Sequence, residues 1–241
     1  MDEIYGGIVS SAGDVGELDQ YGDLGGERAV NTRQKIAIIG GTGTVGRGIV
    51  EQALAEGYPI RMLVRNTAKV TVTLEHLEIV EGDARDPQAV AEVLKGCNVV
   101  INAFGQPSRE KFPIYSQLTR QILDIMKVYD IRRYIGVTGG SLNVPGDRKS
   151  FINRLGAALF RLIYSSLVSD KEKELALLQS SDADWTLLRL PFVVEGSASG
   201  RVKVNEKDMP GTKMRTADIA DFVIRQIEDR QYIRKTPFIS N

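Results

Sequence analysis

Closely spaced glycines follow the first apolar run that reads as a strand. Residues 35–39 are Lys-Ile-Ala-Ile-Ile, and helical spacing of apolar residues begins a few positions later, at Val45. Between them, Gly40 permits a tight turn, Gly43 leaves room for a diphosphate, and Gly46 lets a helix pack closely. Backbone amides at the start of such a helix bind phosphate oxygens. We therefore predict a dinucleotide-binding loop whose ligand contacts come from Gly40, Thr42, Gly43, Thr44, Val45 and Gly46.

A positively charged residue lies at the strand end that usually determines the choice between NAD and NADP. The next apolar run, 59–64, ends in Arg65 and Asn66, about 25 residues after the first glycine. Sites that prefer NAD place an acid near this position, whereas an arginine forms paired, charge-assisted hydrogen bonds with a 2′-phosphate. Arg65 and Asn66 therefore predict NADPH as the cofactor, with NADH as the alternative. A solvent-facing arginine at a strand end is the competing interpretation.

Three further strand ends carry small or polar residues. Asp83, followed by Ala84, could accept a hydrogen bond from an adenine amino group or could cap a turn. The small residues and backbone of 103–105 would pass behind the adenine ribose, and Thr138 and Ser141 follow the fifth strand. The predicted cofactor-binding residues here are Asp83, Ala84, Ala103, Phe104, Gly105 and Thr138.

These residues need a parallel sheet to bring them together. Short apolar runs alternate with helical periodicity, which predicts successive βαβ units. We expect strands at 35–39, 59–64, 77–81, 97–103, 133–138, 185–190 and 237–240, and helices at 44–57, 87–95, 112–129, 170–180 and 216–228. Ser169 or Asp170 is expected to cap the fourth helix. The predicted fold is α/β, a Rossmann-type doubly wound parallel sheet in a single domain, with a small C-terminal substrate-side portion.

The composition limits the kinds of binding partner that we expect. The 241 residues carry 31 basic and 31 acidic side chains. Residues 1–34 have seven acids and two arginines, which predicts a flexible acidic extension and leaves the domain at 35–241 with a net charge of about +5. No basic run suggests nucleic-acid binding, and no apolar stretch is long enough to span a bilayer. We expect a cytoplasmic protein without a membrane partner.

The sequence gives little support for a metal site or a Ser-His-Asp triad. The chain has one histidine, His76, and one cysteine, Cys97, so neither a histidine nor a thiolate metal site is expected. The segment 151–167 mixes apolar residues with Arg154 and Arg161. It could cover the substrate as a lid, or it could contact a membrane or a partner helix.

The combined motifs resemble the atypical short-chain dehydrogenase/reductases, in the NAD(P)H-binding branch that contains NADH-flavin reductases and biliverdin-IXβ reductase. The similar segments are Gly-Gly-Thr-Gly-Thr-Val-Gly at 40–46, Arg65, Gly-Asp-Ala at 82–84, Thr-Gly-Gly-Ser-Leu at 138–142, residues 181–191 and Thr-Ala-Asp-Ile-Ala at 216–220. Together they span most of 35–241. The resemblance implies a nicotinamide-dependent reductase whose cofactor ring lies near Thr138 and the backbone of Pro191, Phe192 and Val193.

The resemblance also implies roles for residues on the fourth helix. Lys171 is similar in position to the lysine that bonds the nicotinamide ribose in the wider superfamily. Classical members have a proton-donating tyrosine four residues earlier, where this chain has Leu167. Tyr164 could face the same crevice if the chain bends there. The predicted catalytic residues are Lys171, Tyr164, Thr138 and Ser141.

Three functions are consistent with this pattern. The first is NADPH-dependent reduction of a small planar acceptor such as a flavin or a quinone. The product anion of such an acceptor is delocalised, so water can supply its proton and no proton donor from the protein is needed. The second is a non-catalytic NADP(H) sensor that binds a protein partner, which the absence of a tyrosine at position 167 motivates. The third is an epimerase acting on a nucleotide-linked sugar.

Overall fold

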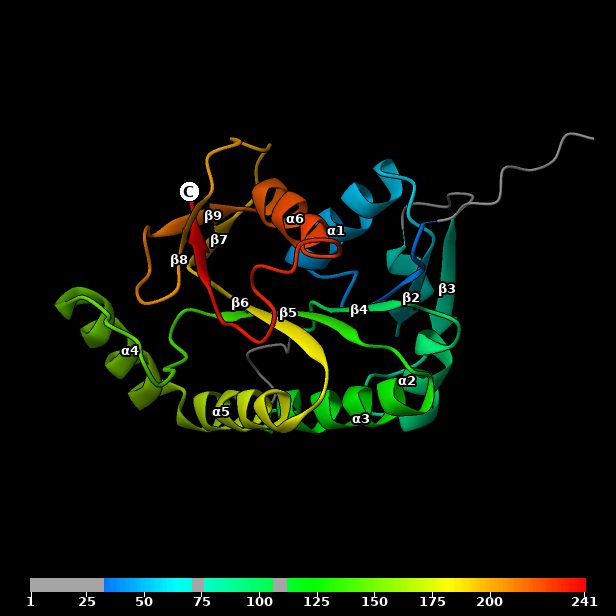
Figure 1. Ribbon diagram of the computed structural model, residues 1–241, viewed down its shortest axis with the longest axis horizontal. Helices are drawn as coiled ribbons and strands as arrows, with labels where there is room; N and C mark the ends of the chain where they lie inside the picture. The colour runs from blue at the N-terminus through cyan, green and yellow to red at the C-terminus, as the bar shows by residue number, and fades with distance from the viewer. Residues whose placement is uncertain (1–32, 71–75, 106–111) are drawn as a thin grey trace, which may run out of the picture. The chain divides into compact units, whose positions relative to one another are not determined.

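Eight strands of the computed structural model form one sheet in the order β3-β2-β1-β4-β5-β6-β10-β8 (Figure 1). The structure describes residues 33–70, 76–105 and 112–241, so the predicted extension lies outside the described residues except for Arg33 and Gln34. Every pairing in this sheet is parallel except that of β10 with β8. The strands are β1 (Ile36–Ile39), β2 (Ile60–Val64), β3 (Leu77–Glu81), β4 (Val99–Asn102), β5 (Arg133–Gly139), β6 (Asp184–Leu190), β8 (Lys203–Asn205) and β10 (Phe238–Ser240). The predicted doubly wound sheet is confirmed.

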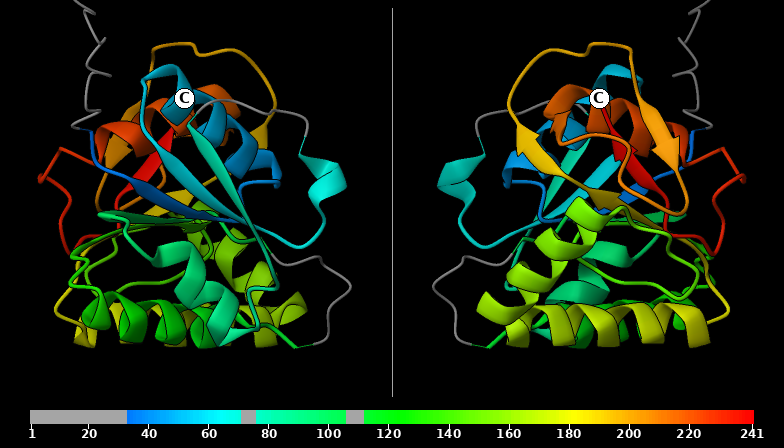
Figure 2. Two further views of the ribbon diagram at one scale, coloured as in Figure 1. Left: turned by 90° about the vertical axis from the view of Figure 1, so that its right-hand side faces the viewer. Right: turned by 90° about the vertical axis from the view of Figure 1, so that its left-hand side faces the viewer.

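Helices cover both faces of the sheet, and Figure 2 shows the layers from two further sides. Buried residues of α1 (Thr44–Ala55) and α6 (Thr216–Arg225) pack in one core cluster, and those of α2 (Pro87–Leu94), α3 (Tyr115–Val128) and α5 (Ser165–Ser180) pack in the other. β1 alternates between the two: Ile36 and Ile38 belong to the first cluster, Ala37 and Ile39 to the second. Burial on both faces explains why the strand is an uninterrupted apolar run.

The strand order reverses between β1 and β4. The chain winds outward from β1 through β2 to β3, then returns to place β4 on the other side of β1. The loops that follow β1 and β4 therefore diverge and leave a crevice beyond the carboxyl ends of these strands, where doubly wound proteins bind their ligands.

One helix begins earlier than the sequence predicted. The helix expected at 170–180 is α5, which starts at Ser165, so neither Ser169 nor Asp170 caps it. The Asp170 carboxylate instead accepts hydrogen bonds from the backbone N–H and the hydroxyl of Ser116, in the first turn of α3. That carboxylate therefore caps a neighbouring helix, a tertiary use that local sequence does not reveal.

Three short strands and one α-helix of the described residues were not predicted as such. β7 (Phe192–Val194) and β9 (Lys213–Arg215) form a separate two-stranded parallel sheet, and β8 is the short edge strand. The helix is α4 (Phe151–Ile163), which lies within the segment whose role the sequence left open. In Figure 1 it extends beyond the end of α5, away from the helix layers.

Candidate functional site

A cleft of about 850 Å³ lies at the carboxyl ends of the central strands. It falls within the roughly 300–1,000 Å³ that small-molecule and cofactor sites occupy. The predicted residues that line it are Gly40, Thr42, Gly43, Thr44, Val45, Arg65, Asn66, Ala84, Ala103, Phe104, Gly105, Thr138, Lys171, Pro191 and Val193. The structure places Gly46, Asp83, Ser141, Tyr164 and Phe192 outside this lining. The topology therefore brings most, but not all, of the predicted residues to one site.

The glycine loop turns sharply between β1 and α1. Gly40 has φ +85°, a left-handed conformation in which a Cβ would also lie 2.6 Å from the backbone of Ala103. The N–H of Gly43 donates to the carbonyl of Gly40 over 3.0 Å and closes the turn. A Cβ on Gly46 would overlap that same carbonyl. Glycine at position 46 thus lets the first turn of α1 pack against the loop, as its spacing indicated.

The start of α1 is suited to an anion. Gly43 is its N-cap and provides no side chain to bond the amides of the first turn, and that turn contains no acid. Thr42, Gly43, Thr44 and Val45 line the cleft around this helix end. The helix dipole places partial positive charge there, so phosphate oxygens would meet N–H donors without displacing a side-chain cap.

Arg65 lies directly after β2 and faces a shared carboxylate. Its guanidinium is 3.9 Å from Asp83, whose carboxylate is also 3.5 Å from the Arg85 guanidinium and accepts a hydrogen bond from the Arg85 backbone N–H. The turn-capping alternative for Asp83 is therefore confirmed, whereas its contact with adenine stays a prediction. The side-chain oxygen of Asn66 accepts from the N–H of Ala68 and begins a short 3-10 helix, Thr67–Lys69.

Lys171 sits against two residues that the sequence reasoning missed. Its ammonium lies 3.8 Å from the ring centre of Tyr115 and 3.8 Å from a carboxylate oxygen of Glu174. Thr119 donates a hydrogen bond to the other oxygen of Glu174. Burial lowers the pKa of Lys171 and raises the pKa of Glu174, while the attraction between the two groups opposes both shifts.

These neighbours carried different sequence signals. Glu174 follows Lys171 by three residues, a helical spacing that favours an ion pair, so the partner was available from sequence alone. Tyr115 belongs to α3 and reaches the lysine only through tertiary packing, which Asp170 fastens by binding the start of α3. Tyr115 lines the cleft beside Lys171, and its ring also meets Phe104 edge-on at 5.6 Å between ring centres.

The predicted catalytic residues separate into two groups. Lys171 and Thr138 line the cleft, and the buried hydroxyl oxygen of Thr138 has no hydrogen-bond partner among the described residues. Tyr164 lies at the junction of α4 and α5, is 44% exposed, and stacks on Phe160 at 4.8 Å between ring centres. The chain does bend there, by 110°, but the bend carries Tyr164 to α4 rather than to the cleft lining. Ser141 follows β5 outside the lining.

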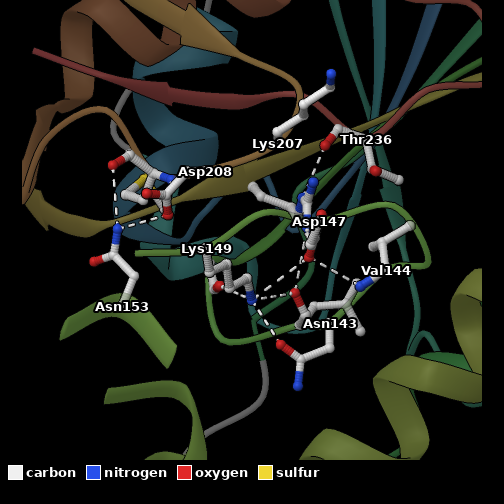
Figure 3. Close-up of polar contacts among 12 residues, drawn as sticks. Asn143, Val144, Asp147, Lys149, Asn153, Lys207, Asp208 and Thr236 are labelled. Carbon is white, nitrogen blue, oxygen red and sulfur yellow. Dashed lines mark hydrogen bonds and ion pairs between the residues drawn. The ribbon is translucent and has the colours of Figure 1, made fainter. Parts of the chain in front are cut away.

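A buried charged network holds the loop that follows β5. Arg189, in β6, is fully buried and donates to both carboxylate oxygens of Asp147 at 2.9 and 2.7 Å. The ammonium of Lys149 donates to the carbonyls of Gly140 and Leu142 and to the side chain of Asn143, and Figure 3 shows it beside Asn143 and Asp147. Burial lowers the pKa of both Arg189 and Lys149. These bonds fix the loop after β5, which begins next to Thr138.

The geometry agrees with comparisons with known proteins. Residues 40–230, well over half of the chain, match the family described as NAD(P)H-binding. Among curated proteins, the photosystem II assembly factor Ycf39 of Guillardia theta is 29% identical over 83% of this chain and 63% of its own length. YwnB of Bacillus subtilis is 30% identical over 64% of this chain and 70% of its own length. The chain spans less than two thirds of the Ycf39 proteins that it matches.

Solved structures share the fold. A short-chain dehydrogenase/reductase from Veillonella parvula, in complex with NADP, superposes with a TM-score of 0.73 at 16% identity and covers 86% of this chain and 94% of its own. An anaerobillin reductase from Escherichia coli O157:H7 superposes with a TM-score of 0.69 at 21% identity, over 86% of this chain and 96% of its own. The sequence match and the shared fold show that this chain belongs to the NAD(P)H-binding family.

Proposed function

We propose that this chain binds NADPH in the cleft and reduces a small planar acceptor, such as a flavin or a quinone. The observation that carries the proposal is the continuity of the cleft along the strand ends. It is lined by the uncapped start of α1 and by Arg65, which suit phosphates, and also by Lys171, Tyr115 and Thr138, which suit a reacting ring and its ribose.

The strand order supports one orientation of the cofactor. Arg65 follows β2, the glycine loop follows β1, and Thr138 lies in β5, so these residues are spread across neighbouring strands of the sheet. A dinucleotide with its diphosphate at the glycine loop would place its 2′-phosphate toward Arg65 and its nicotinamide toward Thr138 and Pro191. Phe192 is 81% exposed and outside the lining, so its side chain is not expected to contact the nicotinamide.

The residues near the expected nicotinamide fit a reduction in which the protein need not supply the final proton. NADPH, when bound, supplies a hydride to the acceptor. Lys171 would bond the ribose, and the unpartnered hydroxyl of Thr138 would donate to a carbonyl oxygen in the cleft. Tyr115 brings the only phenol of the described lining, held against the Lys171 ammonium. A flavin or quinone can take its final proton from water, because its reduced anion is delocalised.

The test is oxidation of NADPH by the purified full chain with flavin mononucleotide or a simple quinone. We expect NADPH to be oxidised faster with the wild-type protein than in buffer, and more slowly with Thr138→Val than with the wild type. Ser141→Ala is the matched control from outside the lining and should keep the wild-type rate. No acceleration with any acceptor in a broad panel would refute the reductase proposal.

The second candidate is an NADP(H) sensor that binds a protein partner. It is favoured by Leu167, which occupies the position of the superfamily's proton donor, and by Tyr164, which does not line the cleft. The matched Ycf39 relatives are named as assembly factors, which is compatible with such a role. Tight NADPH binding without turnover of any acceptor, together with a change in amide exchange on binding, would favour the sensor over the reductase.

A further inference from the structure

Helix α4 presents an apolar face to solvent. Phe151, Ile152, Leu155, Leu159, Leu162 and Ile163 are between 57 and 80% exposed, and Ala157 is the buried residue of the helix. At 100° per residue these six side chains fall within an arc of about 120°. A contiguous apolar face of this kind on a folded protein marks an interaction surface.

The helix is held in place from its other side. The Asp208 carboxylate accepts hydrogen bonds from the Ser150 backbone N–H at 2.9 Å and from the Asn153 side chain at 2.7 Å, as Figure 3 shows for Asn153. At its far end the chain bends by 110° into α5. The apolar face is therefore presented by an anchored helix whose inner side is occupied.

A lid over the cofactor cleft does not fit this arrangement. α4 contributes no residue to the cleft lining in the described part of the chain. Its inner side faces Asp208 and α5, while its apolar side faces away from both. The lid interpretation that the sequence left open is thus not supported by the position of the helix.

The charge around α4 selects the occupant. Residues 148–169 contain no acid, and three of their bases, Arg148, Arg154 and Arg161, are exposed, whereas Lys149 is buried beside Asp147. Arg154 and Arg161 are seven residues apart and lie within about 20° of each other, along one border of the apolar face. In a second copy the same basic border would meet itself, and Glu172, the acid that bonds Arg161, is already engaged, whereas an anionic surface would complement the border.

The length of α4 suits a helix that lies on a bilayer surface rather than one that crosses the bilayer. Thirteen residues of helix extend about 20 Å, and the hydrocarbon core of a bilayer is about 30 Å thick. No single helix in the described ranges is long and apolar enough to cross a membrane; α4 and α5 together have the length and composition, but they are bent by 110° at their junction and α5 packs in the core through Leu175 and Leu178. A short helix with an apolar face and a basic border lies in the plane of the interface, with its arginines extended toward the headgroups.

We propose that α4 docks this protein on the surface of a bilayer that contains anionic lipids. The apolar face enters the boundary between headgroups and acyl chains, and Arg154 and Arg161 meet lipid phosphates. Arg161 also bonds Glu172 in α5, which holds its guanidinium at this border. The proposal replaces the expectation of a chain without a membrane partner and does not depend on the reaction in the cleft.

The test is cosedimentation of the full chain with vesicles of phosphatidylcholine alone and of phosphatidylcholine with phosphatidylglycerol. We expect binding to the anionic vesicles and an affinity lower by about tenfold or more in Leu162→Glu. Val128→Glu is the matched control, because Val128 is 77% exposed at the end of α3 and Leu162 is 80% exposed on α4. Unchanged melting temperatures and NADPH affinities in both variants would show that folding is intact.

A reporter on the helix gives a second readout. The one cysteine, Cys97, is buried, so Leu159→Cys can be labelled selectively with a polarity-sensitive fluorophore. A blue shift on adding anionic vesicles is expected. Equal binding of Leu162→Glu and wild type, equal binding to both vesicle types, or no binding at all would overturn the proposal. A dimer that Leu162→Glu dissociates, without vesicle binding, would instead assign the face to a second copy.

Discussion

Removal of the Arg65 guanidinium should weaken NADPH binding and leave NADH binding almost unchanged. Arg65 lines the cleft at the end of β2, where it would meet the 2′-phosphate that distinguishes the two cofactors. In Arg65→Ala the glycine loop and the start of α1 keep their contacts with the diphosphate. The substitution therefore isolates the interaction that selects the cofactor.

The magnitude follows from the exposure and the neighbours of Arg65. Hydrogen bonds to a charged group contribute about 1.5–3 kcal/mol. Because the Arg65 side chain is 54% exposed, we take the lower part of this range, about 1.5–2 kcal/mol, or about a 10- to 30-fold loss of affinity. The Asp83 carboxylate, 3.9 Å away, competes weakly for the guanidinium, so Asp83→Asn should increase NADPH affinity a few-fold.

The assay is calorimetric titration of the wild type and each variant with NADPH and with NADH. Arg85→Ala is the matched control, since Arg85 also contacts Asp83 but lies outside the cleft lining. An unchanged ratio of NADPH to NADH affinity in Arg65→Ala would refute the assignment of Arg65. An equal loss for both cofactors would show that the arginine supports the fold of the cleft rather than the 2′-phosphate.

Three further outcomes test the structure around the site. Gly46→Ala should lower the free energy of unfolding by about 1–3 kcal/mol in urea titrations, because its Cβ would overlap the Gly40 carbonyl; unchanged stability would contradict the close approach. Burial raises the pKa of Glu174 above 4.5, so its contribution to stability is present below that pH and is lost as pH rises through the folded pKa. In Glu174→Gln the free energy of unfolding should depend less on pH in this range. A pH dependence identical to that of the wild type would argue against the raised pKa. Burial raises the pKa of Cys97 from 9.0 to about 11, so at pH 8 its thiol should react with a disulfide reagent about 100-fold more slowly than in urea, and equal rates would contradict its burial.

Local sequence was sufficient for the framework of the site. The apolar run of β1, the glycine turn and the start of α1 are adjacent in sequence, so their geometry follows from backbone and packing constraints over a dozen residues. Arg65 could be placed for the same reason, because it directly follows a strand whose neighbour in the sheet is β1. Strand ends meet at one edge of a parallel sheet, which is why most of the predicted residues share the cleft.

Tertiary contacts decided what the sequence did not reveal. Tyr115 reaches Lys171 from another helix, and Asp170 binds the start of α3 rather than its own helix. Tyr164 was predicted for the cleft because it precedes position 167 by almost one helical turn and the chain could bend there, but the bend at the start of α5 leaves Tyr164 beside Phe160 of α4. The apolar side chains of α4 were consistent with a lid, a membrane contact or a partner helix, and only the arrangement of the domain shows them exposed.

The most direct test of cofactor binding in the cleft is a crystal structure of this protein soaked with NADP⁺. We expect the diphosphate at the backbone amides around Gly43 and Thr44, the 2′-phosphate at the Arg65 guanidinium, and the nicotinamide ribose at Lys171. A dinucleotide bound outside the cleft, or one in the cleft with its 2′-phosphate directed away from Arg65, would contradict this expectation.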